Sequence, residues 1–217
     1  MGPFDTIIFD MDGTLLDTLD DLTDGVNYAL GQMNWPLHTR EEVRFFVGNG
    51  SELLMRRAAP PGADQADLDR LLAIYKPYYA AHARDKTAPY PGIPELLKTL
   101  RERGVKTAVV SNKFDLAVKE LSDFYFPGLL DAAAGEDEKN GVPKKPDPTM
   151  VRGTLALLGA KRAVYVGDSD TDLLTAANAG LPCISVTWGF RNEAFLKTHG
   201  ATTFIHEPME LISFVKS

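Results

Sequence analysis

The sequence has little cysteine, no excess of positive charge and no long apolar run. Cys183 is the only cysteine among 217 residues, which excludes an internal disulfide and any metal site built from clustered thiolates. The formal net charge of −7 argues against a surface that binds nucleic acid or an anionic membrane. No apolar run approaches the roughly 20 residues that span a bilayer. We therefore expect neither nucleic acid nor a membrane as a partner.

The start of the chain also lacks the pattern of a secretory signal peptide. No basic segment leads into an apolar stretch, and the apolar run at residues 6–9 is too short for a signal-peptide core. Together with the single cysteine, this predicts a cytoplasmic protein. The histidines show no spacing typical of metal ligands. The sequence leaves open whether the protein is a monomer or a homodimer.

A strand-like run that ends in two acids stands near the start of the chain. Residues 6–9, TIIF, are apolar and rich in β-branched side chains, and Asp10 follows them directly. Asp12 comes two positions later, so both carboxylates point to one side if the backbone stays extended. Gly13 then permits a sharp turn. The pattern is typical of the ligand-binding edge of a parallel sheet, although alone it also fits a strand–helix connection capped by Asp12 or Thr14.

Residues 17–88 interrupt this start with helical patterns. Apolar side chains recur at helical spacing in 17–33, 51–58 and 66–83, and residues 39–42 show a capping-box pattern. No stretch of this segment alternates like a strand. We therefore expect an inserted helical domain at 17–88.

The rest of the chain alternates between strand and helix patterns. The expected strands are at 105–110, 129–134, 163–166 and 183–186, and helical patterns separate them, including one at 146–158 and a last one near the end of the chain. Such alternation predicts right-handed crossovers and a parallel sheet. The fold class is thus expected to be α/β, a Rossmann-like doubly wound core formed by residues 1–16 and 89–217.

Further polar side chains follow the other strands or stand in the loop before a helix. They provide a hydroxyl, an amide, an ammonium and two carboxylates: Ser111, Asn112, Lys145, Asp168 and Asp172. Since the ends of parallel strands share one edge of a sheet, we expect these groups to meet the two early acids. Two carboxylates about 4 Å apart repel by roughly 4 kcal/mol at an effective dielectric near 20, so a divalent cation is expected among them. All-oxygen donors favour Mg²⁺ over Zn²⁺.

A lysine and a serine beside a cation-neutralised carboxylate suit the binding of a phosphoryl group. The carboxylate can then act as a nucleophile. Each residue alone has a plainer interpretation: Ser111 with Asn112 as a strand-end turn, Lys145 as a solvated surface lysine, and Asp168 as a helix cap. Their joint appearance in this order favours a phosphoryl-transfer site.

Four stretches of the sequence resemble the motifs of the haloacid dehalogenase superfamily: DMDGTLLDT, VVSNK, KKPDP and VGDSDTDLLTAANAG. The resemblance runs nearly end to end and implies that residues 17–88 form a C1-type cap. In phosphatases of the superfamily it implies Asp10 as nucleophile and Asp12 as general acid/base. The resemblance further implies the ligands of the phosphoryl group and of Mg²⁺. Ser111, with the adjacent Asn112, and Lys145 would bind the phosphoryl group; Asp10, the backbone carbonyl of Asp12 and Asp168 would hold Mg²⁺, with Asp172 in the outer shell.

Within the superfamily, PYPGI, VVSNK and VTWGF look most like phosphoglycolate phosphatases, which implies 2-phosphoglycolate, a small phosphorylated metabolite, as substrate. C1 caps carry substrate contacts in the loop that here contains Asn49, Gly50 and Ser51. A plain helix–helix turn is the competing interpretation of that loop. Arg44 is a candidate to bind a substrate anion.

Three alternatives remain at this point. A pyrophosphatase or nucleotidase would use the same core. A β-phosphoglucomutase would as well, although Leu22 stands where those mutases carry a histidine. A phospho-acceptor signalling module also places acids, a hydroxyl and a lysine around Mg²⁺, but it needs no lid that excludes water.

Overall fold

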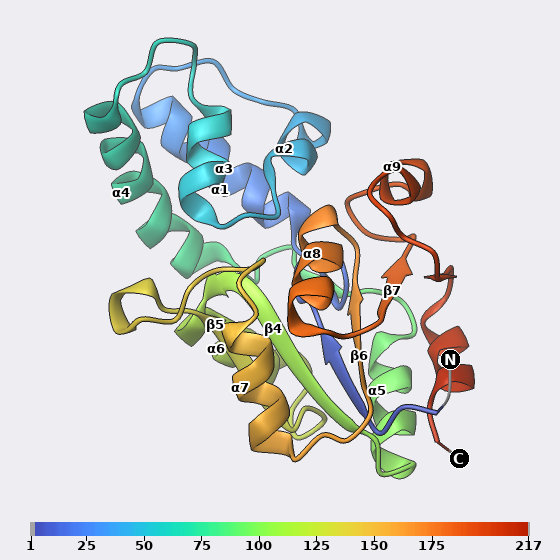
Figure 1. Cartoon of the computed structure of the whole chain (residues 1–217). Helices are drawn as coiled ribbons and strands as arrows, with labels where there is room; N and C mark the ends of the chain where they lie inside the picture. The colour runs from blue at the N-terminus through green and yellow to red at the C-terminus, as the bar shows by residue number, and fades with distance from the viewer. Residues whose placement is uncertain (1–2, 217) are drawn as a thin grey trace. The chain divides into compact units, whose positions relative to one another are not determined.

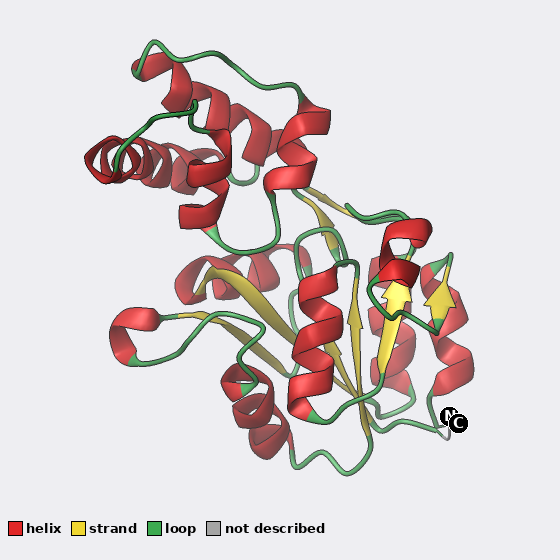
Figure 2. Cartoon of the chain, turned by 45° about the horizontal axis from the view of Figure 1, so that its top comes forward, coloured by secondary structure: helices red, strands yellow, loops and turns green. Residues whose placement is uncertain are grey.

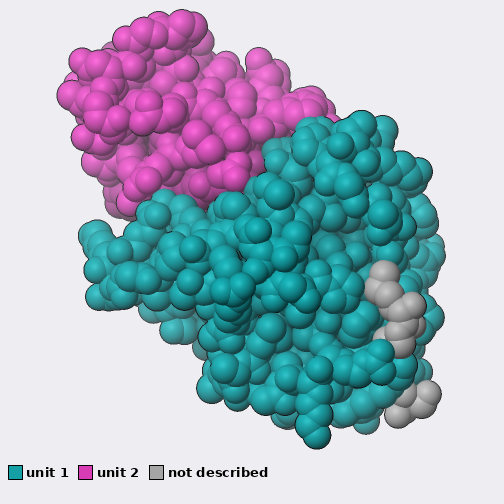
Figure 3. All heavy atoms as spheres, in the orientation of Figure 1, with its two compact units in different colours: residues 1–16, 89–217 teal, residues 17–88 magenta. Residues whose placement is uncertain are grey.

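The structure is a computed structural model that describes residues 3–216 (Figure 1). The chain forms two compact units, which Figure 3 shows in different colours. The larger unit comprises residues 1–16 and 89–217, and the smaller one comprises residues 17–88.

Within the described residues, the larger unit is built on a six-stranded parallel sheet with the order β5-β4-β1-β6-β7-β8. The strands are β1 (Thr6–Phe9), β4 (Lys106–Phe114), β5 (Ala132–Glu136), β6 (Ala163–Gly167), β7 (Cys183–Val186) and β8 (Phe204–Ile205). After β1 the chain adds β4 and β5 on one side, and it then returns to add β6, β7 and β8 on the other. The strand order therefore reverses beside β1, and such a reversal is where α/β sheets bind ligands.

Helices cover both faces of this sheet (Figures 1 and 2). On one face, α5 (Ile93–Glu102), α6 (Asp115–Tyr125) and the 3₁₀ segment η2 (Pro208–Phe214) join the larger apolar cluster. On the other face, α7 (Thr149–Leu158) and α8 (Asp170–Ala179) join the second cluster. The short elements η1 (Glu138–Asn140) and α9 (Glu193–Thr198) complete the unit.

Burial on both faces explains why β1 appears as a continuous apolar run. Ile7 belongs to the cluster on one face and Ile8 to the cluster on the other, and both side chains are fully buried. Successive side chains of a strand point to opposite faces, so burial of both faces favours apolar side chains at consecutive positions of this central strand. The predicted doubly wound α/β fold is confirmed.

The structure corrects several expected element bounds. β4 continues through Ser111 and Asn112 to Phe114 because it pairs with β5 as far as Glu136, with a register irregularity after Val110. The expected strand at 129–134 lies at 132–136 instead.

Two helices also differ from expectation. The helix expected from residue 146 begins at Thr149, whose backbone N–H donates to the Asp147 side chain in the preceding loop. The last expected helix is the 3₁₀ segment η2.

Residues 17–88 form the helices α1 (Leu19–Gln32), α2 (Arg40–Phe46), α3 (Ser51–Ala58) and α4 (Gln65–His82). The predicted capping box is present at the start of α2, between Thr39 and Glu42. The buried Asp21 carboxylate accepts hydrogen bonds from the backbone N–H groups of Lys86 and Thr87 and from the Thr87 hydroxyl, which ties α1 to the segment that follows α4.

The short strands β2 (Leu16–Asp17) and β3 (Ala88–Pro89) form a separate two-stranded sheet. Across residues 3–216, every helix is too short or too polar to cross a membrane.

Candidate active site

The carboxyl ends of β1 and β6 and the first turn of α8 bring three acids together. Asp10 follows β1, Asp168 follows β6, and Asp172 lies in α8. One carboxylate oxygen from each acid lies within 4.8 Å of the others, and all three residues are buried. The strand order explains this meeting, because β1 and β6 are neighbours in the sheet.

Lys145 lies between two of these acids. Its Nζ lies 2.9 Å from Asp10 Oδ1, 2.8 Å from Asp172 Oδ1 and 3.0 Å from the Tyr165 hydroxyl. An ammonium has three N–H donors, and these three acceptors match them. Only 4% of Lys145 is exposed, so it is not a solvated surface lysine.

The cluster is short of positive charge. Three carboxylates and one ammonium give a formal −2, taken as 3 × (−1) + 1 for the acids and Lys145. Burial, followed by the charge of Asp172, raises the pKa of Asp10 well above its usual value. Burial and Asp172 also raise the pKa of Asp168 to about 7, although Arg191 acts in the opposite direction. Burial alone would lower the pKa of Lys145, but the surrounding acids raise it well above the ordinary value. A divalent cation would balance the remaining negative charge.

The Asp172 carboxylate has no lone pair left for a cation. Its Oδ2 accepts hydrogen bonds of 3.1 Å from the backbone N–H groups of Asp168 and Ser169, and one of 2.7 Å from the Ser169 hydroxyl. Its Oδ1 accepts from Lys145 and Tyr165. Since a carboxylate offers about four acceptor positions, Asp172 is saturated. Asp10 and Asp168 are therefore the cluster members that fit a metal.

The Asp10 contacts lie on one oxygen. Asp10 Oδ1 accepts from the backbone N–H of Met11 at 2.7 Å and from Lys145. Oδ2 receives no hydrogen bond from the residues that the structure describes. This oxygen is the one available to a metal or to an electrophile.

Two loops close around the Asp168 carboxylate. The Thr14 hydroxyl donates to Oδ1 at 3.3 Å, and the backbone N–H of Phe190 donates to Oδ2 at 2.6 Å. A Cβ atom at Gly13, where φ is +85°, would lie 2.4 Å from Oδ2, and one at Gly189 would lie 2.5 Å from it. Both positions thus require glycine so that the backbone can approach this carboxylate.

Ser111 and Asn112 lie near the end of β4, and both are buried. The Ser111 hydroxyl accepts from the backbone N–H of Lys113 at 3.2 Å. The Asn112 side chain instead holds the main chain of Lys145: its oxygen accepts from the Lys145 N–H at 2.6 Å, and its amide donates to the Lys145 carbonyl at 3.2 Å. Asn112 therefore fixes the loop that carries Lys145.

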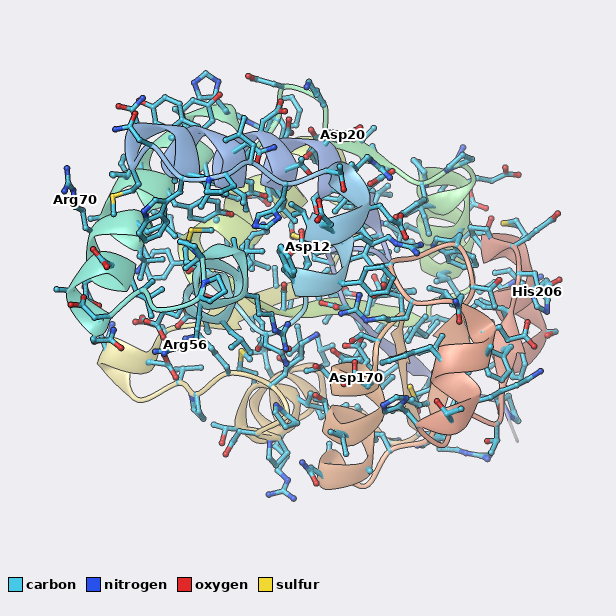
Figure 4. All side chains as sticks on the ribbon, turned by 90° about the horizontal axis from the view of Figure 1, so that it is seen from above. Asp12, Asp20, Arg56, Arg70, Asp170 and His206 are labelled. Carbon is cyan, nitrogen blue, oxygen red and sulfur yellow. The ribbon has the colours of Figure 1, made fainter. Side chains whose placement is uncertain are left out.

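Asp12, labelled in Figure 4, stands apart from the three-acid cluster and beside Lys113. Lys113 Nζ lies 3.4 Å from Asp12 Oδ1, and both side chains are largely buried. Among the described residues, no group donates a hydrogen bond to this buried Oδ1.

The sequence did not identify two residues of the site. Tyr165 looks like an ordinary apolar strand residue, and Lys113 carries no local signal of a role beside an acid. Lys113 lies within VVSNK, so only the family resemblance includes it.

The candidates in residues 17–88 lie within the smaller unit. Arg44 Nη2 forms a 2.6 Å ion pair with Glu41 on the same helix. The Asn49 oxygen accepts from Arg57 Nη2 at 3.1 Å, and Arg57 Nη1 donates to the Phe46 carbonyl at 2.7 Å. Gly50 and Ser51 form the start of α3. The two Arg57 contacts order the loop before α3.

Comparison with known proteins places this geometry in a family. Residues 7–186 match the model of the haloacid dehalogenase-like hydrolases. The chain belongs to this family. The resemblance noted in the four motifs is thereby confirmed.

Several known proteins are similar to the chain over most of their length. A phosphoglycolate phosphatase of Caulobacter vibrioides is 36% identical over 214 residues, which cover 95% of this chain and 88% of that protein. One of Mesorhizobium japonicum is 35% identical over 192 residues, covering 85% and 83%. The structure of a protein assigned as a phosphoglycolate phosphatase from Lactobacillus delbrueckii subsp. bulgaricus has a TM-score of 0.94 and 38% identity, and the match covers 99% of this chain and 100% of that one.

Proposed function

We propose that the chain is a Mg²⁺-dependent phosphatase that hydrolyses a small phosphate monoester, 2-phosphoglycolate, to glycolate and phosphate. The observation that carries this proposal is the buried Lys145 ammonium, which lies 2.9 Å from the Asp10 carboxylate and leaves a net negative charge on the three acids around it. The relatives named phosphoglycolate phosphatases support the choice of substrate.

In the proposed mechanism, Asp10 is the nucleophile. Its carboxylate oxygen attacks phosphorus, the bond from phosphorus to the ester oxygen breaks, and Asp12 donates a proton to the departing glycolate. Asp12 then takes a proton from water while the water oxygen attacks the phosphorus of the aspartyl phosphate. This second step releases phosphate and regenerates Asp10.

Asp10, Asp168 and the backbone carbonyl of Asp12 would hold Mg²⁺. The cation, when bound, supplies positive charge beside the transferring phosphoryl group. Ser111 would bind that group, and Lys145 would both orient Asp10 and stabilise the charge that develops.

Two assignments follow from contacts in the structure. The Asn112 side-chain amide forms hydrogen bonds with both the backbone N–H and the carbonyl of Lys145. We therefore assign Asn112 a positioning role in place of the phosphate contact that the sequence predicted. Asp172 would act in the outer shell, since its oxygens are already saturated by the groups around it.

The smaller unit, residues 17–88, would serve as the cap. A lid over the site keeps bulk water from competing with the leaving group and provides contacts that select it. The short hydrogen-bonded segments β2 and β3, at the two points where the chain passes between the units, would then act as the hinge.

Replacing the nucleophile tests the chemistry. Asp10→Asn is expected to abolish turnover of 2-phosphoglycolate, because an amide cannot form the phosphoryl intermediate. Asp170→Asn is the matched control: Asp170 is the first residue of α8 (Figure 4), near the cluster, and makes none of the contacts described above. Retained activity in purified Asp10→Asn would refute the assignment of the nucleophile.

A screen of phosphorylated metabolites tests the substrate. The ratio kcat/KM is expected to be highest for 2-phosphoglycolate. A clear preference for pyrophosphate or a nucleotide would refute this substrate and leave the aspartate chemistry in place.

A further inference from the structure

Lys113 is a buried cation next to the proposed general acid. Its Nζ lies 3.4 Å from Asp12 Oδ1, and only 8% of its side chain is exposed, against 17% for Asp12. Its backbone N–H donates to the hydroxyl of Ser111, so its main chain is tethered to the serine that would bind the phosphoryl group. Lys113 therefore contacts both Asp12 and Ser111, and the scissile bond would lie between these two residues.

The proposed reaction defines where the leaving group must be. Asp12 has to come within about 2.7 Å of the ester oxygen in order to protonate it. In 2-phosphoglycolate a single methylene separates that oxygen from the carboxylate. A cation 3.4 Å from Asp12 Oδ1 is thus within reach of the leaving-group carboxylate.

Lys145, the buried lysine of the acid cluster, does not serve this role, because its three N–H donors are directed to Asp10, Asp172 and Tyr165. Arg44, predicted from the sequence to bind a substrate anion, remains a candidate in the smaller unit.

We propose that Lys113 binds the carboxylate of the leaving group and thereby selects a carboxylate-bearing phosphate ester. The inference rests on the proposed function for the position of the leaving group. It places a determinant of specificity in the α/β core, on the strand that also carries Ser111, in addition to the cap loop.

A simpler role for Lys113 would be to hold Asp12 in place. That role would affect every substrate equally, since every phosphate ester requires the same proton transfer. A carboxylate ligand affects only substrates that have the carboxylate. A pair of substrates therefore separates the two roles.

The test compares 2-phosphoglycolate with 2-hydroxyethyl phosphate, which replaces the carboxylate by a neutral hydroxymethyl group. In Lys113→Met, the ratio of the two kcat/KM values is expected to fall roughly tenfold to a hundredfold, mainly through KM for 2-phosphoglycolate. Lys113→Arg keeps the charge and should restore much of the ratio. Lys119→Met is the control for loss of a positive charge, because Lys119 is exposed on the adjacent α6 and pairs with Asp115.

A binding measurement covers the case in which Lys113→Met turns over too slowly. The ligand is 3-phosphonopropionate, a non-hydrolysable analogue that keeps the carboxylate. Its inhibition constant should rise at least tenfold in the variant. If no turnover remains, its dissociation constant should rise by the same factor. The corresponding constant for propylphosphonate, which lacks the carboxylate, should change far less. If Lys113→Met weakens kcat/KM equally for both substrates and binding equally for both phosphonates, the inference is overturned. Failure of the proposed function is a different result: the wild-type protein would then show no preference for 2-phosphoglycolate.

Discussion

The indole N–H of Trp188 donates a 3.0 Å hydrogen bond to the carbonyl oxygen of Thr14. The hydroxyl of the same threonine donates to Asp168, and the backbone N–H of Phe190, two residues after Trp188, donates to the same carboxylate. The loops that follow β1 and β7 are thus tied together around the carboxylate to which we assign Mg²⁺.

Removal of this indole donor is expected to weaken metal binding. Trp188→Phe keeps an aromatic ring but leaves the Thr14 carbonyl without its donor, a loss of about 1 kcal/mol. If that loss falls on the metal-bound state, the Mg²⁺ concentration for half-maximal activity should rise about fivefold, with a smaller change in kcat at saturating Mg²⁺. Trp35→Phe, in the smaller unit, is the matched control. An unchanged Mg²⁺ requirement in Trp188→Phe would contradict this prediction.

Gly189→Ala should be more damaging. The added Cβ would lie 2.3 Å from Asp168 Cβ and 2.4 Å from the Gly13 carbonyl oxygen, so the loop or the carboxylate has to move. Crowding of this kind costs about 1–3 kcal/mol of stability, which denaturant unfolding would measure. Gly153→Ala provides the contrast: this glycine lies in α7 with no atom near its missing Cβ, so alanine should stabilise by about 0.5–1 kcal/mol. Equal effects of the two substitutions would refute the close approach at Gly189.

The pKa of Asp168 predicts how Mg²⁺ and pH act together on stability. Its folded-state pKa is raised to about 7 from 3.8, so the folded, metal-free protein binds the proton more tightly than the unfolded chain does. The stability from this group is therefore fully present below pH 3.8 and is lost as the pH rises through about 7. Mg²⁺ requires the ionised carboxylate, so the rise in Tm that it causes should be small at pH 6 and larger at pH 8.

Calorimetry or a thermal shift assay at the two pH values, with and without Mg²⁺, measures this difference. Asp168→Asn should abolish the Mg²⁺-induced shift at both. Identical shifts in the wild-type protein at pH 6 and pH 8 would contradict the prediction.

Arg44 in α2 and Asn49 in the loop before α3 are still predicted to contact the leaving group. Arg44→Ala or Asn49→Ala should lower kcat/KM for 2-phosphoglycolate roughly tenfold to a hundredfold and should spare p-nitrophenyl phosphate. Arg70→Ala, a change at an exposed arginine of α4 (Figure 4), is the control for charge. Equal loss of both substrates would show that these residues serve folding or closure of residues 17–88.

Some parts of the site were predictable because they depend on local pattern. Thr6–Phe9 and Ala163–Gly167 are buried on both faces, so each appears as a short apolar run followed by an aspartate. Helical periodicity likewise marked the segment at 17–88, where each helix buries one face. The presence of Asp10 and Asp168 at strand ends could therefore be inferred from the sequence.

Other parts depended on which residues the fold brings together. Trp188 and Thr14 are 174 positions apart in the chain, and Lys145 and Asn112 are 33 apart, so no local pattern connects them. Local patterns likewise do not predict that Asn112 binds the main chain of Lys145 or that Lys113 lies beside Asp12.

The sequence by itself determined which segments become strands and helices and which polar side chains stand at their ends, because burial and backbone geometry act over a few residues. Only the tertiary structure decided which of those side chains become partners. The order β4-β1-β6 places Lys145 between Asp10 and Asp172, closes the Trp188 loop over Asp168 and puts Lys113 against Asp12. These contacts depend on packing between elements that lie far apart in the chain, and packing of that kind exists only once the sheet has formed.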